Sequence, residues 1–248
     1  IGSVIIIFLF TLITALFNSS SKKIFEAIQS LIVNKFSWVF TGSTIIFLAF
    51  VLILLFSNVG RIRLGKPGET PEFSYTAWFT MMFSAGMGIG LVFWSIAEPI
   101  KHFINPPIKS IDFFSPAEQA IAVTFFHWGL HAWATFMVVG LSLAYFSFRK
   151  GLPLTIRSCL YPILGEKIFG RWGDFIDIFA VVGTMFGVVT SLGLGAMQVN
   201  SGLQFLGNFP ETRLAQIILI ALITICATTS VILGLEKGIR RLSHFNVS

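Results

Sequence analysis

Six long stretches of this sequence contain no Asp, Glu, Lys or Arg, and together they make up more than half of the chain. Each is long enough to cross a bilayer as a helix, which requires about 20 mostly apolar residues. Only 11% of the residues are charged and 55% are hydrophobic, whereas soluble domains carry about 25% charged residues. The sequence therefore predicts an all-α polytopic membrane protein with six transmembrane helices. It excludes a soluble enzyme, a nucleic-acid-binding domain, a disulfide-stapled secreted module and a disordered chain. The six uncharged runs are 1–21, 36–60, 73–97, 119–148, 178–210 and 214–235.

The basic residues indicate which side of the membrane each connection faces. The chain has a formal net charge of +6, and eleven of its 17 Lys and Arg residues lie in alternate connections, at 61–72, 149–172 and 236–248. Because cytoplasmic loops are enriched in Lys and Arg, these connections are predicted to be cytoplasmic. The sequence thus predicts a multi-pass protein of the cell (inner) membrane whose N-terminal end is cytoplasmic.

The ends and the prolines give further expectations. Residue 1 is Ile and the last residues form a basic amphipathic segment, so we expect an internal piece of a longer protein. All nine prolines lie in connections or at the ends of the uncharged runs, which predicts that any break inside a span comes from glycine. The connection 149–172 mixes charges, prolines and short apolar patches, which favours a short helix lying in the membrane interface.

The third run carries three glycines near its middle, Gly86, Gly88 and Gly90. Glycine in a helix interior costs about 1 kcal/mol relative to Ala, so three of them within five residues weaken the helix. One interpretation is a small-residue contact that lets another helix approach closely. The other is an unwound segment whose free carbonyl and N–H groups meet a cation and a carboxylate, as in the discontinuous helices of transporters.

The fourth run contains a cluster of aromatic residues. On a continuous helix with Trp128 at 0°, Phe136 lies near 80° and Trp133 near 140°, so the three share one broad face. The π-faces of such rings attract a quaternary ammonium ion, which has no hydrogen to donate; the alternative is that they are packing residues or interfacial anchors. His127 and His131 lie one turn apart without a third ligand in this run, so we interpret them as structural histidines rather than metal ligands.

The fifth run places small residues at four-residue spacing, at Gly183, Gly187, Ser191 and Gly195. This pattern favours close helix packing. Thr184 flanks the ridge and is a candidate oxygen ligand for an ion. Acidic residues are absent from all six runs, and Asp174, Asp177 and Glu98 are interpreted as interfacial acids without a functional role.

Five motifs in order resemble the betaine/choline/carnitine transporter family, and the resemblance covers essentially the whole chain. It implies a partial inverted-repeat fold like that of the neurotransmitter:sodium symporters, with two peripheral helices in residues 1–60 and four helices of the first repeat in residues 73–248. The second repeat is missing. It also implies homotrimers in the membrane lipid. The motifs are Gly86-Met-Gly-Ile-Gly90, Ala97-Glu-Pro99, His127-Trp-Gly-Leu-His-Ala-Trp133, Ser191-Leu-Gly-Leu-Gly-Ala196 and Gly234-Leu-Glu-Lys-Gly238.

The resemblance also implies the site residues. The stretch Gly86, Met87, Gly88, Ile89 and Gly90 matches the unwound segment that meets substrate. Trp128 and Trp133 match cage positions, and Phe136 stands where the family usually has Tyr. The backbone of Ser84 and Met87 matches one sodium site. Thr184 matches a ligand of another site, and Val188 stands here at the position of its companion threonine.

These residues lead to one predicted function and several alternatives. We expect a secondary transporter that imports glycine betaine or a related zwitterionic trimethylammonium osmolyte, with Na+ as the coupling ion, no cofactor and no nucleic-acid partner. Choline carriers of the family tend to have Asp at the position of Gly90, and a cation needs such a partner in a dry site; glycine therefore favours a zwitterion. The alternatives are a proton-coupled choline carrier, a carnitine exchanger, or a truncated subunit that is inactive by itself. A membrane-embedded enzyme is disfavoured, because no acid or nucleophile–base pair lies in a span.

Overall fold

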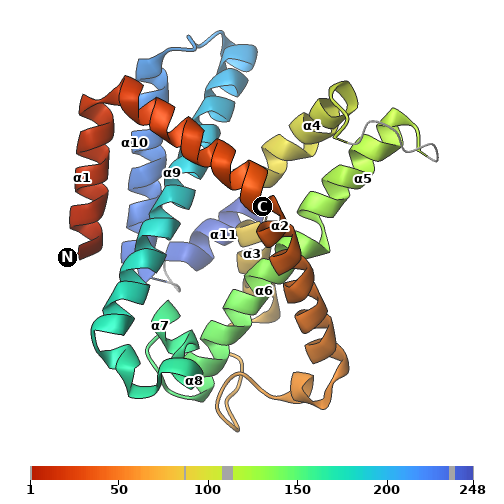
Figure 1. Ribbon diagram of the computed structural model, residues 1–248, viewed down its shortest axis with the longest axis vertical. Coiled ribbons are helices and arrows are strands. Elements are labelled where there is room, and N and C mark those ends of the chain that lie inside the picture. Colours follow the sequence, from red (N-terminus) through yellow and green to blue (C-terminus); the bar gives the residue numbers. More distant parts are fainter. Residues whose placement is uncertain (1, 87, 108–113, 235–237, 248) are drawn as a thin grey trace. The chain divides into compact units, whose positions relative to one another are not determined.

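The computed structural model describes residues 2–86, 88–107, 114–234 and 238–247, and all regular structure in them is helical (Figure 1). The elements are α1 (Gly2–Leu16), α2 (Asn18–Phe56), η1 (Asn58–Arg61), α3 (Tyr75–Gly86), α4 (Ile89–Ile104), α5 (Pro116–Trp128), α6 (Leu130–Ala144), η2 (Tyr145–Arg149), α7 (Ile156–Cys159), α8 (Tyr161–Leu164), η3 (Gly165–Phe169), α9 (Arg171–Gly207), α10 (Arg213–Ile232) and α11 (Arg240–Val247). The predicted all-α polytopic fold is confirmed.

Four described helices are long and apolar enough to cross a membrane, at Asn18–Phe56, Pro116–Arg149, Arg171–Gly207 and Arg213–Ile232. The pair α3 and α4 makes a fifth span if it is counted as one broken helix. The predicted span in run 1–21 is divided: α1 has only 15 residues, which is about 22 Å of helix against a hydrocarbon core of about 30 Å. Helix α9 has 37 residues, or about 55 Å, so it must tilt or extend beyond the bilayer.

The connection predicted at 22–35 is helical and belongs to α2. Residues 18–41 contain neither Gly nor Pro, and Lys22 and Glu26 form an ion pair of 3.8 Å one turn apart. Both features favour a continuous helix. The three lysines of this segment therefore lie on a helix rather than in a loop.

The chain forms two compact units. The first comprises Ile1–Glu69 and Phe126–Met185, and the second comprises Thr70–Phe125 and Phe186–Ser248. In the first unit α2 packs against α6 and α1 packs against α2, with the rings of Phe10 and Phe25 5.5 Å apart. In the second unit α11 packs against α3. The division into residues 1–60 and 73–248, which follows helix repeats rather than contacts, stays a prediction.

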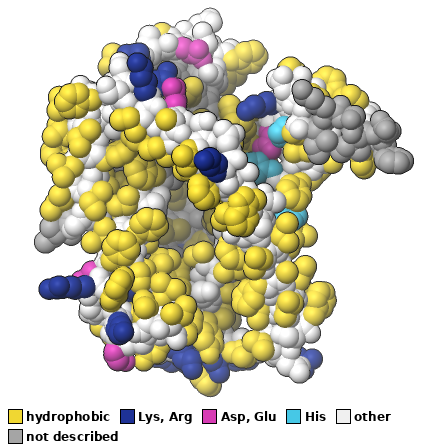
Figure 2. Space-filling model, in the orientation of Figure 1, with side chains coloured by type: hydrophobic (Ala, Val, Ile, Leu, Met, Phe, Trp, Pro, Cys, Tyr) yellow, Lys and Arg dark blue, Asp and Glu magenta, His cyan; other side chains and the backbone are white. Residues whose placement is uncertain are grey.

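Most large apolar side chains point outward from the described helices. Only five hydrophobic residues of the described chain are buried, and four of them are alanines: Ala77, Ala120, Ala134, Ile168 and Ala196. Hydrophobic side chains cover much of the face shown in Figure 2. Outward-facing apolar side chains are what a bilayer requires of a spanning helix.

The helix ends show how local sequence sets the boundaries. At the start of α5, the backbone N–H of Ser115 donates to Glu118 Oε2 (2.8 Å), and the Glu118 N–H donates to Ser115 Oγ (3.3 Å). This is a capping box with Pro116 at the first helical position. At the start of α10 the Thr212 hydroxyl accepts from the Ala215 N–H. Helix α9 ends where Asn208 adopts a φ of 53°, followed by Pro210.

One expectation about proline is wrong. Pro99 lies inside α4 rather than at its end, because the helix continues five residues beyond it to Ile104. Pro99 has no N–H to donate, so the carbonyl of Ser95 lacks its usual partner one turn ahead. Glu98, directly before it, is 6% exposed, and its Oε1 lies 3.2 Å from His102 Nε2. The acid predicted to be interfacial is thus a buried member of a pair on α4.

Candidate functional site

The glycine-rich segment of the third run interrupts a helix. Helix α3 ends at Gly86, Gly88 has an extended backbone (φ −75°, ψ 169°), and α4 begins at Ile89. The two helices are bent by 41°. Such a break leaves carbonyl groups at the end of α3 and N–H groups at the start of α4 without partners in their own helix. The structure therefore favours the unwound segment over the continuous small-residue contact.

The residues on either side of this break have different hydrogen-bond partners. Met87 lies outside the described residues. Gly88 caps α4, since its carbonyl accepts from Leu91 N (3.0 Å) and Val92 N (3.3 Å), and Ile89 and Gly90 form the first turn of that helix. The Ser84 hydroxyl donates to the Ser243 carbonyl of α11 at 3.4 Å. The side chain of Ser84 is thus engaged with a neighbouring helix, whereas its predicted role uses the backbone.

The aromatic run is also interrupted, at a single residue. Trp128 is the last residue of α5, Gly129 has φ −82° and ψ −142°, and α6 begins at Leu130. Gly129 therefore interrupts the regular helix, although α5 and α6 lie in one span, Pro116–Arg149; the angles from Trp128 to the other two rings, which assume an unbroken helix, are not exact across it. A lone glycine needs no side-chain space and adopts such a conformation at low cost.

Two of the three predicted cage residues lie side by side on α6. The rings of Trp133 and Phe136 have centroids 5.9 Å apart, and both side chains are exposed, Trp133 at 43% and Phe136 at 70%. The Trp128 ring lies 5.0 Å from the His127 ring, and the His131 ring lies 4.3 Å from Phe126. All three predicted cage residues belong to the first compact unit. The glycine break belongs to the second, so the structure describes the two parts of the predicted site separately.

Thr184 lies in the middle of α9, with its hydroxyl donating to the Ala180 carbonyl at 2.8 Å. This is the bond that most helical threonines make, and it leaves the lone pairs of the oxygen free for a cation. Over the described residues there is no group of three or more His, Cys, Asp or Glu able to hold a metal ion.

Comparison with known proteins decides the family. The sequence matches the betaine/carnitine/choline family transporter profile over residues 1–248. The chain belongs to the betaine/carnitine/choline transporter family. It is similar to a glycine betaine transporter of Acinetobacter baylyi, with 43% identity over 100% of this chain and 37% of the relative. It is also similar to the glycine betaine transporter OpuD of Bacillus subtilis, with 47% identity over 92% of this chain and 45% of the relative.

A third relative is named for a different substrate, choline. The osmo-dependent choline transporter BetT2 of Acinetobacter baylyi is 41% identical over 99% of this chain and 36% of its own length. The chain thus spans less than half the length of these relatives. Family members and relatives are transporters rather than enzymes, and with its long apolar helices this member is a multi-pass membrane protein.

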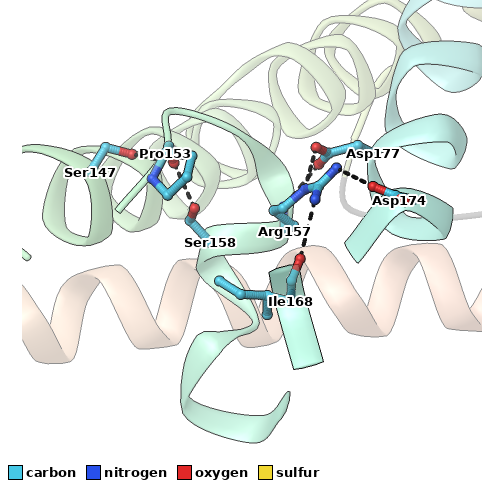
Figure 3. Close-up of polar contacts among 7 residues, drawn as sticks. All are labelled: Ser147, Pro153, Arg157, Ser158, Ile168, Asp174 and Asp177. Atoms are coloured by element: carbon cyan, nitrogen blue, oxygen red, sulfur yellow. Dashed lines mark hydrogen bonds and ion pairs between the residues drawn. The ribbon is translucent and has the colours of Figure 1, made fainter. Parts of the chain in front are cut away.

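Among the described residues, Arg157 donates several side-chain hydrogen bonds outside the predicted site. Arg157 of α7 donates from Nε to Asp177 Oδ2 (2.6 Å), from Nη2 to Asp174 Oδ1 (3.0 Å) and from Nη1 to the Ile168 carbonyl (3.2 Å) (Figure 3). Its backbone N–H also donates to Asp177 Oδ1 at 3.2 Å. We call Arg157, Ile168, Asp174 and Asp177 the arginine clamp. The segment of short helices is thereby tied to the first two turns of α9.

The residues next to the arginine clamp are hydrogen-bonded and buried. The Pro153 carbonyl accepts from Ser158 Oγ (2.6 Å) and from Ser147 Oγ (3.1 Å) (Figure 3). Ser158 and Ile168 are fully buried, at 0% exposure. Hydrogen bonding to Asp177, and then to Asp174, raises the pKa of the Arg157 guanidinium above its ordinary value. An arginine side chain is protonated in proteins at ordinary pH, so the guanidinium of this group is charged.

Two neighbouring groups in the connection have shifted pKa values as well. Burial raises the pKa of the Cys159 thiol. The hydrogen bond that Tyr161 Oη donates to Glu166 Oε1 (3.0 Å) raises the pKa of the Tyr161 phenol. The predicted interfacial helix is in fact three short helical segments, α7, α8 and η3.

Sequence reasoning missed the clamp. It treated Asp174 and Asp177 as solvated acids at a helix start, because a helix dipole explains them without a partner. Their partner is 17 and 20 residues away, across a segment that contains Pro162 and the short helices α8 and η3. Neither helical nor strand periodicity predicts a contact between side chains so far apart in the sequence. Arg157 is one of five basic residues in the connection 149–172, and no sequence pattern distinguishes it from the others.

Proposed function

We propose that this chain forms part of a secondary transporter that imports glycine betaine or a related zwitterionic trimethylammonium solute. The observation that carries the proposal is the exposed ring pair of Trp133 and Phe136, 5.9 Å apart. Cation–π contacts of this kind contribute about 0.5–2 kcal/mol each with a quaternary ammonium ion. The names of two relatives, both glycine betaine transporters, support the same substrate.

The family resemblance assigns substrate contact to the break between α3 and α4 as well. The N–H groups at the start of α4 carry the positive end of the helix dipole, which favours an anionic group. A zwitterion has both a trimethylammonium group for the rings and a carboxylate for these N–H groups. Gly90 adds no carboxylate of its own near the break, so the site residues suit a zwitterion better than a bare cation.

The coupling ion and the orientation belong to the same proposal. Na+ prefers oxygen ligands, and the backbone at Ser84 and Met87 and the Thr184 hydroxyl are the candidate donors. We place the N-terminal end in the cytoplasm of the cell membrane on the distribution of basic residues, and homotrimers follow from the family resemblance alone.

Choline is the second candidate, because BetT2 is a choline transporter and is 41% identical to this chain. A choline carrier needs an acidic partner for its substrate that the described glycine break does not contain. Gly90→Asp introduces one, and we expect it to improve choline uptake relative to betaine uptake.

Uptake of labelled solutes tests the proposal. The complete gene product is expressed in transporter-deficient cells, and betaine and choline uptake are measured with sodium present or replaced by potassium. We expect sodium-dependent betaine uptake, with the betaine KM raised about 2–30-fold in Trp133→Ala, as the loss of one cation–π contact implies. The matched control is Trp38→Ala, because Trp38 is 72% exposed on α2, outside the site.

Two results would overturn the proposal. Equal betaine uptake by wild type and Trp133→Ala would remove the aromatic pair from the site. Choline uptake that exceeds betaine uptake and does not depend on sodium would replace the zwitterion with the choline alternative.

A further inference from the structure

Arg157 uses every nitrogen of its guanidinium group, and its acceptors lie on two different elements. Nη1 binds the backbone carbonyl of Ile168 in η3, while Nε and Nη2 bind two carboxylates of α9. The planar guanidinium holds its donors in a fixed fork, so three simultaneous bonds determine direction as well as distance. The Arg157 and Asp177 side chains are only 20% and 22% exposed, which limits solvent screening of that pair.

The clamp determines both how close α9 comes to η3 and how it is rotated. Gly173 allows the close approach, because a Cβ atom there would lie 1.7 Å from the Ile168 carbonyl oxygen. Asp174 and Asp177 are three residues apart and share one face of α9. A rotation of α9 about its axis would carry both carboxylates away from the fork.

The same face of α9 carries Thr184. Thr184 follows Asp177 by seven residues, which is almost two full helical turns, and α9 continues without interruption between them. The two side chains therefore point in nearly the same direction, about 10 Å apart along the axis. Whatever fixes the rotation at Asp177 also fixes the direction of Thr184.

We propose that Arg157 is a positioning residue that sets the rotation of α9 and thereby the orientation of the Thr184 hydroxyl. The effect of Arg157 on sodium binding rests on the proposed function above. The effect of Arg157 on the direction of the side chain at position 184 does not depend on that function, so each effect is measured in its own experiment.

The first experiment measures the orientation of α9 without transport. Thr184→Cys is introduced into the complete gene product in a cysteine-free background, and its reaction rate with a charged methanethiosulfonate reagent is measured in membrane vesicles. Arg157→Lys retains the positive charge but removes the fork, so we expect the rate at position 184 to change several-fold. The matched control is Glu166→Gln, which removes an exposed carboxylate of the same connection and should leave the rate unchanged.

The second experiment measures the sodium KM and the betaine KM of the protein with native Thr184. Loss of a residue that orients a ligand typically costs about 10–100-fold in ion affinity. We expect Arg157→Lys and Asp177→Asn to raise the sodium KM by about tenfold or more, with the betaine KM at saturating sodium little changed. A general loss of structure would instead lower the amount of folded protein and the maximal rate.

The outcomes separate the two proposals. Equal thiol reaction rates at position 184 in the protein with native Arg157 and in the Arg157→Lys variant would overturn the positioning role, whatever the uptake assays show. If the wild-type protein shows no sodium dependence, sodium coupling fails, and the thiol rates alone decide whether Arg157 orients α9. Parallel increases in both KM values would also count against the positioning role.

Discussion

Replacing Gly173 with alanine tests the packing of α9 against η3 directly. Helix propensity alone predicts a gain, because Ala is favoured over Gly in a helix by about 1 kcal/mol. The structure predicts the opposite sign. An alanine Cβ would lie 1.7 Å from the Ile168 carbonyl oxygen and 2.6 Å from its carbon, and both are backbone atoms that no rotamer change can remove.

The cost can be worked from the contacts that must change. The Ile168 carbonyl has to move by more than 1 Å to reach a tolerable separation of 3.0 Å. Overpacking of this kind costs about 1–3 kcal/mol. The movement also breaks the Arg157 bond to the Ile168 carbonyl (3.2 Å), and hydrogen bonds to charged groups contribute about 1.5–3 kcal/mol. After subtracting the propensity gain, we expect a net destabilisation of about 1.5–5 kcal/mol.

Thermal unfolding of the purified complete protein in detergent measures this effect. The Tm falls by about 2–4 °C per kcal/mol for chains of 150–250 residues and by less for a longer protein, so we expect Gly173→Ala to lower the Tm of the complete protein by several degrees. Gly183→Ala on the same helix is the matched control, because a Cβ there meets nothing within 4 Å; its Tm should stay unchanged or rise. A Gly173→Ala protein as stable as wild type would refute the close approach of η3 to α9.

Two further predictions concern the connection and the aromatic pair. Because burial raises the pKa of the Cys159 thiol, less of the reactive thiolate is present at any given pH. Alkylation of Cys159 should therefore reach its half-maximal rate at a higher pH in the folded protein than in the SDS-unfolded protein. Equal dependence of the alkylation rate on pH in the two states would contradict this prediction. Phe136→Tyr keeps the ring and should leave the betaine KM nearly unchanged, whereas Phe136→Ala should raise it by about 2–30-fold; equal KM values for the two variants would exclude a contact between this ring and the substrate.

Several features of the fold could be predicted from the sequence because they depend on local chemistry. Charged residues are costly in a hydrocarbon environment, so the uncharged runs located the long helices. The three closely spaced glycines also indicated a weak point, and α3 ends at the first of them. The assignments of Gly86 to Gly90, Trp128, Trp133, Phe136, Ser84, Met87 and Thr184 to a site stay predictions.

Other breaks were not predictable in the same way. A single glycine within a helical run is usually tolerated, so nothing distinguished Gly129, which interrupts the aromatic run, from Gly183, which does not. Pro99 shows the converse. A proline near a run end usually stops a helix, yet α4 continues past Pro99 to Ile104 with the loss of one intrahelical hydrogen bond.

The sequence by itself determined the class of protein, since solvation of charged and apolar groups depends only on which residues follow one another along the chain. Only the tertiary structure decided the arginine clamp. Arg157, Ile168 and Asp177 are separated by 9 to 20 residues, and their bonds form where α7 and η3 meet the start of α9, next to Gly173. Contacts of this kind depend on where separate segments meet in space, which no local pattern of residues specifies.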